Sequence, residues 1–230
     1  MRGMIPDASV DLVYLDPPFN SNATYNVLFK PPEELGDAAQ IKAFEDTWHW
    51  TVQTEREYEE ILKNPYGNSD LAKLTSALRQ FLGDNDMMAY LVHMANRLLE
   101  IRRVMKDTAS IYLHCDPTAS HYLKLVMDAV FGVKNFRNEI VWCYTSGGKS
   151  KKTFAKKHDI IIFYTKTDNY FFNADDVRIP YSKKTLENYK PGLKGSSYTA
   201  EVRLHEKGKI PEDYWVIAIA SKSTREYLHY

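Results

Sequence analysis

The stretch VDLVYLDPPF at residues 10–19 decides the fold of this chain. Its first six residues are almost continuously apolar, which predicts a strand buried on both faces of a sheet. Two prolines then remove backbone donors, so the strand ends at Asp16. The prolines make a rigid corner that presents one carboxylate, bare carbonyls and the ring of Phe19. Because ligands bind at the carboxyl ends of strands in open α/β sheets, we expect a binding site here.

The chemistry that suits this corner is capture of a planar group that carries an exocyclic amine. Asp16 can accept one hydrogen bond from an NH2 group, a carbonyl near Pro17 can accept the second, and Phe19 can stack on the ring. Two acceptors localise the nitrogen lone pair and make the amine a better nucleophile. Adenine and cytosine carry such an amine, and an enzyme must extrude the base from the duplex to reach it. The alternative is a plain strand-ending turn, since Asp and Pro are ordinary turn residues.

Length and composition describe an ordinary globular protein. The 230 residues are 44% hydrophobic, enough for a substantial core. No apolar run approaches the ~20 residues that span a bilayer and no signal pattern opens the chain, so we expect a soluble, cytoplasmic protein. The two cysteines, Cys115 and Cys143, make neither a disulfide framework nor a metal set, and we expect no metal. The net charge of zero disfavours a strongly basic nucleic-acid binder without excluding one, because charge distribution matters more than the sum.

The order of apolar patterns predicts a Rossmann-like α/β sheet. Residues 20–36 are rich in turn formers and predict a loop, and residues 54–82 predict two helices. A third helix is predicted by an apolar stripe at helical spacing, and a fourth over residues 117–131. Strands are predicted at 10–15, 109–114, 139–145 and 159–165, the last two as an antiparallel hairpin. The stripe comprises Leu91, Met94, Leu98, Ile101 and Met105, and the inner face of the fourth helix Tyr122, Leu125, Val126 and Ala129.

Five segments, taken in order, resemble a known family. VYLDPPFN at 13–20 resembles motif IV of the DNA amino-methyltransferases. Four further segments are similar to segments of the β-group of these enzymes: FEDTWHW at 44–50, YLHCDP at 112–117, WCYTSGG at 142–148 and KHDIIIFY at 157–164. Modification subunits of type III restriction systems and their solitary cousins are the relatives that fit. The resemblance covers most of residues 5–230, and the ordered set is far more specific than DPPF alone.

The resemblance implies transfer of a methyl group from S-adenosylmethionine to an exocyclic amine in duplex DNA, after base flipping. Adenine-N6 is the preferred target and cytosine-N4 the alternative, because DPPF serves both. The implied partners are duplex DNA and either a second copy or a restriction subunit. The implied site residues are Asp16, Pro17, Pro18 and Phe19 for catalysis, Asn20, Tyr25 and Asn26 in a loop beside the flipped base, and Asp16 with Pro17 toward the cofactor.

A basic loop joins the two hairpin strands and contains five lysines: Lys149, Lys151, Lys152, Lys156 and Lys157. Lysines are flexible point charges that suit phosphate contacts, which position a protein on DNA without reading its sequence. We therefore predict DNA binding by this loop. A solvated hairpin tip is the alternative.

The same resemblance gives the domain organisation. We expect a partial methyltransferase catalytic domain at residues 1–168, with a helical insertion at about 30–85. Residues 169–230 are expected to hold the irregular target-recognition region and the start of a link to a cofactor-binding half.

The chain departs from the family at one motif. The β-group carries a glycine-rich cofactor segment similar to D-P-F-x-G-x-G near the C-terminus, and these 230 residues contain no such segment. We therefore expect a fragment of a larger enzyme, or a degenerate gene product, that binds S-adenosylmethionine weakly and is inactive alone.

Two other functions stay open. Enzymes with a related N-P-P-Y corner methylate glutamine amides in proteins, although Asp16, the aromatic segment at 44–50 and the basic hairpin favour DNA. The second alternative is a DNA-binding remnant that recognises sites without modifying them. This alternative predicts duplex binding that weakens as the salt concentration rises.

Overall fold

The computed structural model describes residues 3–17, 24–28, 40–45, 48–63, 69–144, 150–189 and 203–218. It forms two compact units. The first comprises Met1–Tyr170 together with Tyr214–Tyr230, and the second comprises Phe171–Asp213.

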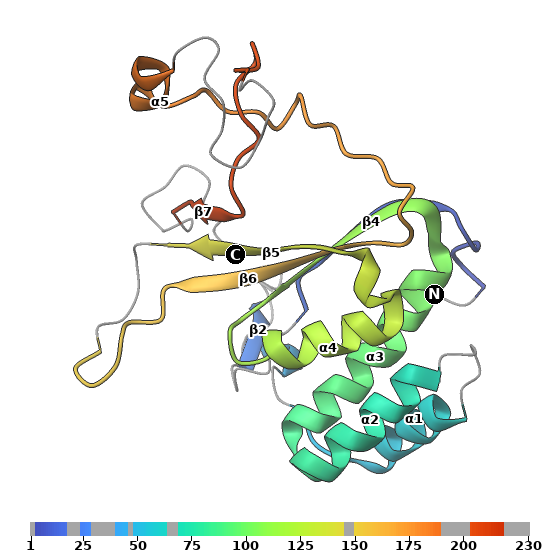
Figure 1. Cartoon of the computed structure of the whole chain (residues 1–230). Coiled ribbons are helices and arrows are strands. Elements are labelled where there is room, and N and C mark those ends of the chain that lie inside the picture. The colour runs from blue at the N-terminus through green and yellow to red at the C-terminus, as the bar shows by residue number, and fades with distance from the viewer. Residues whose placement is uncertain are drawn as a thin grey trace, which may run out of the picture. The chain divides into compact units, whose positions relative to one another are not determined.

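A five-stranded mixed sheet organises the first unit (Figure 1). The strands lie in the order β1-β4-β6-β5-β7. β1 is parallel to β4 and β7 is parallel to β5, whereas β6 is antiparallel to both of its neighbours. The predicted hairpin, which brings an antiparallel strand into the sheet, is therefore confirmed. The strand bounds are β1 Val10–Leu15, β4 Met105–Cys115, β5 Phe136–Cys143, β6 His158–Thr165 and β7 Tyr214–Val216.

Four helices gather on one side of this sheet (Figure 1). They are α1 (Val52–Leu62), α2 (Ser69–Leu82), α3 (Asp86–Val104) and α4 (Ser120–Phe131). The start of α3 is fixed by Asn85, whose side chain accepts a hydrogen bond from the Met88 amide at 2.9 Å. The first four residues of the predicted stripe are buried in α3, while Met105 is the first residue of β4.

The core lies between α3, α4 and one face of the sheet. Ile111, Leu113, Ile162 and Tyr164 point from the strands into this core and are fully buried. The alternating residues point to the opposite face, where the rings of Tyr112 and Phe163 stack at 4.4 Å. That second face carries a smaller apolar cluster of Ile140, Ile161 and Phe163, against which Tyr112, Tyr170 and Trp215 pack.

The predicted burial of β1 on both faces is wrong. Leu12 is 60% exposed and Tyr14 57% exposed, whereas Val13 and Leu15 pack on the core. The reason is the place of β1 in the sheet. Among the described strands it pairs only with β4, and α3 and α4 cover only one face.

Two expectations for residues 20–85 are corrected. Part of the predicted loop at 20–36 forms strand β2 (Thr24–Leu28), which pairs antiparallel with β3 (Gln40–Glu45). Because β3 lies inside the insertion expected at about 30–85, that insertion is not wholly helical. The alternation of apolar and polar residues at 40–43 was the signal for a strand.

The fourth helix is shorter than predicted, and a different face of it is buried. It begins at Ser120, and its buried residues include Leu123, Val126 and Met127, whereas Leu125 is 45% exposed. Its end agrees with the sequence, since Gly132 follows with a φ of 90° and its amide donates to the carbonyl of Asp128. A positive φ of this kind favours glycine.

The boundary between the units differs from the expected one at residues 168 and 169. β7 was placed with the recognition region, but it joins the sheet of the first unit, where Trp215 pairs with Trp142. The indole of Trp142 also donates to the Ile217 carbonyl at 2.7 Å. The second unit contains the short helix α5 (Lys183–Asn188).

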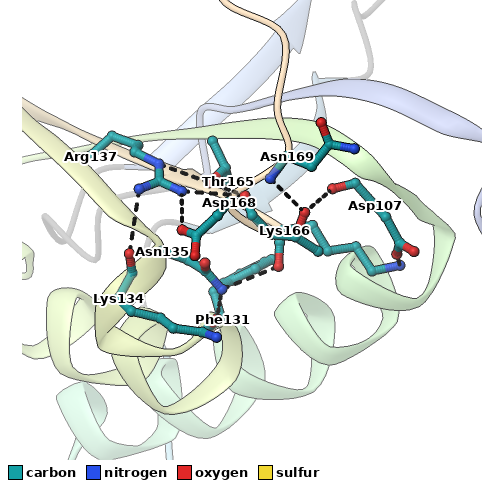
Figure 2. A network of polar contacts seen from close by, with 10 residues as sticks. Asp107, Phe131, Lys134, Asn135, Arg137, Thr165, Lys166, Asp168 and Asn169 are labelled. Carbon is teal, nitrogen blue, oxygen red and sulfur yellow. Dashed lines mark hydrogen bonds and ion pairs between the residues drawn. The ribbon is translucent and has the colours of Figure 1, made fainter.

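A polar network ties β4, β5 and β6 together at one end of the sheet (Figure 2). The guanidinium of Arg137 donates to Thr165 and to Asp168, both at 2.9 Å. The side chain of Asn135, in the short 3-10 turn Val133–Asn135, donates to the carbonyls of Phe131 (2.7 Å) and Lys166 (3.2 Å). These contacts fix the start of β5 to the end of β6.

Candidate active site

The register of the sheet brings Asp16 next to the end of β4. Val13 pairs with Ile111, and Leu15 pairs with Leu113. Asp16, which follows Leu15, therefore lies beside His114, which follows Leu113. At the same edge β5 ends at Cys143, which pairs with His158, the first residue of β6. The ends of β1, β4 and β5 and the start of β6 therefore meet where the sequence predicts a site.

His114 joins two carboxylates at this edge. Its Nδ1 lies 3.0 Å from Oδ1 of Asp16, and its Nε2 lies 3.4 Å from Oδ2 of Asp159. The hydroxyl of Tyr144 donates to Oδ1 of Asp159 at 3.4 Å. The side chains of His114 and Asp159 are 9% and 18% exposed, whereas that of Asp16 is 61% exposed. The network thus connects an open carboxylate to a buried polar interior.

Aromatic rings border the network. The ring of Trp142 lies 5.6 Å from that of His114 and 6.0 Å from that of Tyr144, in each case centroid to centroid. The Trp142 indole is held by its hydrogen bond to Ile217. The two rings therefore lie beside the carboxylate of Asp159, to which Tyr144 donates.

The electrostatic character of the edge is negative. Partial burial of its ring, followed by the charge of Asp16, raises the pKa of Tyr14. Burial, followed by Asp159, raises the pKa of Tyr144. Burial, followed by the charges of Asp116 and Asp159, raises the pKa of the Cys115 thiol far enough to keep it protonated at neutral pH. Burial is the larger cause of each shift, and the neighbouring carboxylates add to it.

The carboxylate of Asp116 has a structural task. Its Oδ1 accepts hydrogen bonds from the amides of Thr118 (3.1 Å) and Ala119 (3.0 Å) in the turn that leads into α4. This contact satisfies backbone donors ahead of the helix, so Asp116 caps the turn.

The predicted site residues divide into three groups. Asp16 and Pro17 lie at the sheet edge, and Asp16 contacts His114. Pro18, Phe19 and Asn20 lie outside the described residues, so stacking by Phe19 stays a prediction. Tyr25 and Asn26 were expected in a loop but lie on β2, where they pair with Phe44 and Lys42.

The basic loop leaves the same edge of the sheet as Asp16, because it joins β5 to β6. Lys151, Lys152 and Lys156 are exposed and Lys157 is partly buried, while Lys149 lies outside the described residues. The loop also presents Phe154, whose side chain is 99% exposed. An aromatic residue inside a run of lysines was the signal that the sequence analysis missed.

Metal ligation finds no support in the described part of the chain. None of its His, Cys, Asp and Glu side chains form a group of three or more that could hold a metal ion. Cys115 and Cys143 are both free thiols. Over the same residues, no helix has the length and apolar character needed to cross a membrane.

A cavity of about 470 Å³ lies away from this edge and is lined by Tyr58, Ser76, Arg79, Gln80, Gly83 and Asp84. The Arg79 guanidinium donates to Glu55 (2.8 Å) and Asp84 (2.7 Å) and lies over the ring of Trp50. Because these contacts join α1, α2 and the turn ahead of α3, we assign the cavity a structural role.

The chain belongs to a family of DNA methylases. The family model, described as DNA methylase of the N6/N4 type, matches residues 10–229.

Individual relatives agree with this assignment. The chain is 24% identical to the type III restriction-modification enzyme StyLTI Mod subunit of Salmonella typhimurium, over 93% of this chain and 31% of the relative. It is 27% identical to the EcoP15I Mod subunit of Escherichia coli, over 86% of this chain and 27% of the relative. Over 36% of its length it is 35% identical to the type II methyltransferase M.KpnI of Klebsiella pneumoniae, of which it covers 20%. The chain thus spans less than a third of the length of these relatives.

One solved structure is also similar. The PvuII DNA methyltransferase, which is cytosine-N4-specific, matches with a TM-score of 0.39 and 10% identity, over 96% of this chain and 55% of that chain.

Proposed function

We propose that this chain supplies the part of a DNA amino-methyltransferase that grips the amine of the target base. The observation that carries the proposal is the position of Asp16. Its carboxylate is open to solvent at the carboxyl edge of the sheet and contacts the protein through His114. Membership in the DNA methylase family supplies the reaction type.

Asp16 acts as a hydrogen-bond acceptor for the amine. One NH2 hydrogen donates to its carboxylate and the other to a carbonyl near Pro17, which localises the lone pair on nitrogen. The donor, when bound, would supply the methyl group to this lone pair and keep the electron pair of the broken carbon–sulfur bond, and one proton would leave the nitrogen for solvent. Phe19 stacks on the extruded base.

The methyl donor in this proposal is S-adenosylmethionine, which supplies a methyl group on a positively charged sulfur. The residues present fit such a cation. Asp16 follows β1, Asp116 follows β4 and Asp159 is the second residue of β6, so three carboxylates lie near the ends of neighbouring strands. Asp16 and Pro17 are the residues we assign to contact with the donor.

Duplex DNA is the proposed substrate and the basic loop its proposed contact. Lys151, Lys152 and Lys156 are exposed on a loop that leaves the edge containing Asp16. A duplex bound there has its phosphates near the lysines and a base near the carboxylate. The fully exposed ring of Phe154 can pack against a base or sugar. A second copy or a restriction subunit is the proposed protein partner.

Adenine is the proposed target and cytosine the alternative. The test compares bases with and without the amine, each placed opposite an abasic site so that extrusion costs little. Duplexes with adenine or amine-free purine form one pair, and duplexes with cytosine or amine-free pyrimidinone form the other. We expect the chain to bind the adenine duplex about 10-fold more tightly than the purine duplex, which corresponds to roughly one hydrogen-bonded amine.

Three outcomes decide the proposal. Preference for the amine in the purine pair supports adenine, and preference in the pyrimidine pair moves the target to cytosine. Salt-dependent binding with no preference in either pair overturns amine capture and leaves a DNA-binding remnant as the function.

A further inference from the structure

His114 is placed to control the orientation of Asp16. We propose that it is a positioning residue, whose Nδ1–H holds Oδ1 of Asp16 and leaves Oδ2 to accept the amine of the target base. The inference rests on the proposed function, and it adds a residue to the site.

The geometry determines where the imidazole proton lies. An ionised carboxylate accepts hydrogen bonds and cannot donate one. Nδ1 is 3.0 Å from Oδ1 of Asp16, so the contact is favourable only when Nδ1 carries a proton. Nε2 is farther from its carboxylate, at 3.4 Å from Asp159. Both the neutral Nδ1–H tautomer and the doubly protonated imidazolium therefore donate to Asp16.

The imidazole itself is rigid. His114 lies on β4, whose neighbours β1 and β6 hold it in register on both sides. Its side chain is only 9% exposed, Asp159 lies on its far side, and the ring of Trp142 is 5.6 Å away. Contacts from three strands thus determine where Nδ1 points.

Asp16 lacks that rigidity. It follows the last residue of β1, and its side chain is 61% exposed. Among the described residues, His114 is the one that hydrogen-bonds its carboxylate. The buried imidazole consequently fixes the orientation of Oδ2. A misplaced acceptor would lower the reaction rate, because the amine would no longer be held in the reactive geometry.

Two substitutions at position 114 separate positioning from packing. His114→Asn puts an amide N–H close to the place of Nδ1 and keeps a donor toward Asp16. His114→Gln puts its amide close to the place of Nε2 and keeps a partner for Asp159 instead. Both are polar and smaller than histidine, and His114→Asn removes one methylene group more than His114→Gln does. Thermal unfolding of each variant shows whether the fold is retained.

The readout is the affinity for the adenine duplex divided by the affinity for the amine-free purine duplex, each with the base opposite an abasic site. The cytosine pair is measured in parallel. We expect His114→Asn to keep the wild-type ratio within about 3-fold and His114→Gln to reduce it about 10-fold. Total affinity for the amine-free duplex stays unchanged in both. A loss of packing alone would affect His114→Asn at least as much as His114→Gln, because asparagine is the smaller residue.

A second measurement needs no DNA. Nitrogen-15 NMR of the histidine side chains reports which ring nitrogen of His114 is protonated. We expect a protonated Nδ1 in the wild-type chain and a changed Nδ1 shift in Asp16→Asn, with no such change in the control Asp11→Asn on the same strand.

The outcomes distinguish the two proposals. If the wild-type chain has no amine preference in either pair, the proposed function fails, and the inference fails with it. If the preference exists but is equally strong in His114→Gln, or if Nδ1 is unprotonated, the inference alone is overturned. Loss in His114→Gln with retention in His114→Asn supports both.

Discussion

His114 and Asp16 are 98 residues apart in the chain, yet Nδ1 of the first lies 3.0 Å from Oδ1 of the second. The parallel pairing of β1 with β4 creates this contact, because Leu15 pairs with Leu113. A buried imidazole therefore holds an exposed carboxylate at the edge where ligands of α/β sheets bind.

Replacing Asp16 by Ala removes the acceptor for the amine. We expect the preference for adenine over amine-free purine, or for cytosine over pyrimidinone, to disappear, a loss of about 10-fold in the ratio. Because the side chain is 61% exposed, the melting temperature changes little. Fluorescence anisotropy with labelled duplexes and a thermal melt check both statements. Asp11→Asn, an exposed carboxylate earlier on β1, is the matched control. Full preference in Asp16→Ala would remove this residue from the mechanism.

Neutralising the basic loop should weaken DNA binding for all base sequences alike. Each phosphate contact that is lost lowers the slope of log affinity against log salt by about 0.9. The variant combining Lys151→Gln, Lys152→Gln and Lys156→Gln is therefore expected to show a slope lower by about 2 to 3. Lys73→Gln on α2, which is similarly exposed, is the control. Equal slopes in the two proteins would mean that the loop is a solvated hairpin tip.

Binding of S-adenosylmethionine is expected to be weaker than micromolar. The sequence has no glycine-rich segment of the D-P-F-x-G-x-G kind to receive the methionine part, although the carboxylates at the edge attract the cation. Isothermal titration calorimetry measures this directly, and the neutral S-adenosylhomocysteine is the comparison. Micromolar affinity for the donor would show that other residues complete the cofactor site.

His93 on α3 makes the stability of the fold depend on pH. Burial, followed by the charge of Arg97, lowers the pKa of His93 from 6.5 to about 4, although Glu57 lies 3.6 Å away and would favour the charged ring. We take burial to prevail, since the side chain is only 18% exposed and Trp48 packs on it.

The sign follows from proton binding. Between about pH 6.5 and pH 4 the unfolded chain binds a proton at His93 that the folded chain does not, so stability falls as the pH falls. The loss between about pH 7 and pH 5 is roughly 2 kcal/mol for this residue. Urea unfolding of the wild type and of His93→Gln at both pH values measures it. We expect a smaller loss in His93→Gln, and an equal loss would contradict the assignment.

Asn135 should be a sensitive position in the network of Figure 2, because its amide donates to two carbonyls, those of Phe131 and Lys166. Asn135→Asp has the same shape but places a carboxylate against those two acceptors. We expect a destabilisation of at least about 2 kcal/mol near neutral pH, from lost donors and a buried charge. Chemical denaturation measures the change in stability, and Lys134→Gln, at the exposed neighbouring position, serves as the control. Unchanged stability would mean that the turn rearranges to satisfy both carbonyls.

Much of the fold could be predicted from local sequence. The apolar run before Asp16, the stripe on α3 and the glycine after α4 each follow from short-range rules on periodicity, proline and helix ends. The boundaries and exposed faces were less accurate. β1 was expected to be buried on both faces, and the strand at 24–28 was expected to be loop, because both outcomes depend on which segments lie next to them.

The sequence by itself determined the family, the hairpin of β5 and β6 and the corner at Asp16, since these depend on residue types within a few positions of one another. Tertiary structure decided that His114 and Asp159 stand beside that corner and that the lysine loop leaves the same edge. The physical reason is that strand register sets distances between residues far apart in the chain, and no local pattern of side chains encodes that register.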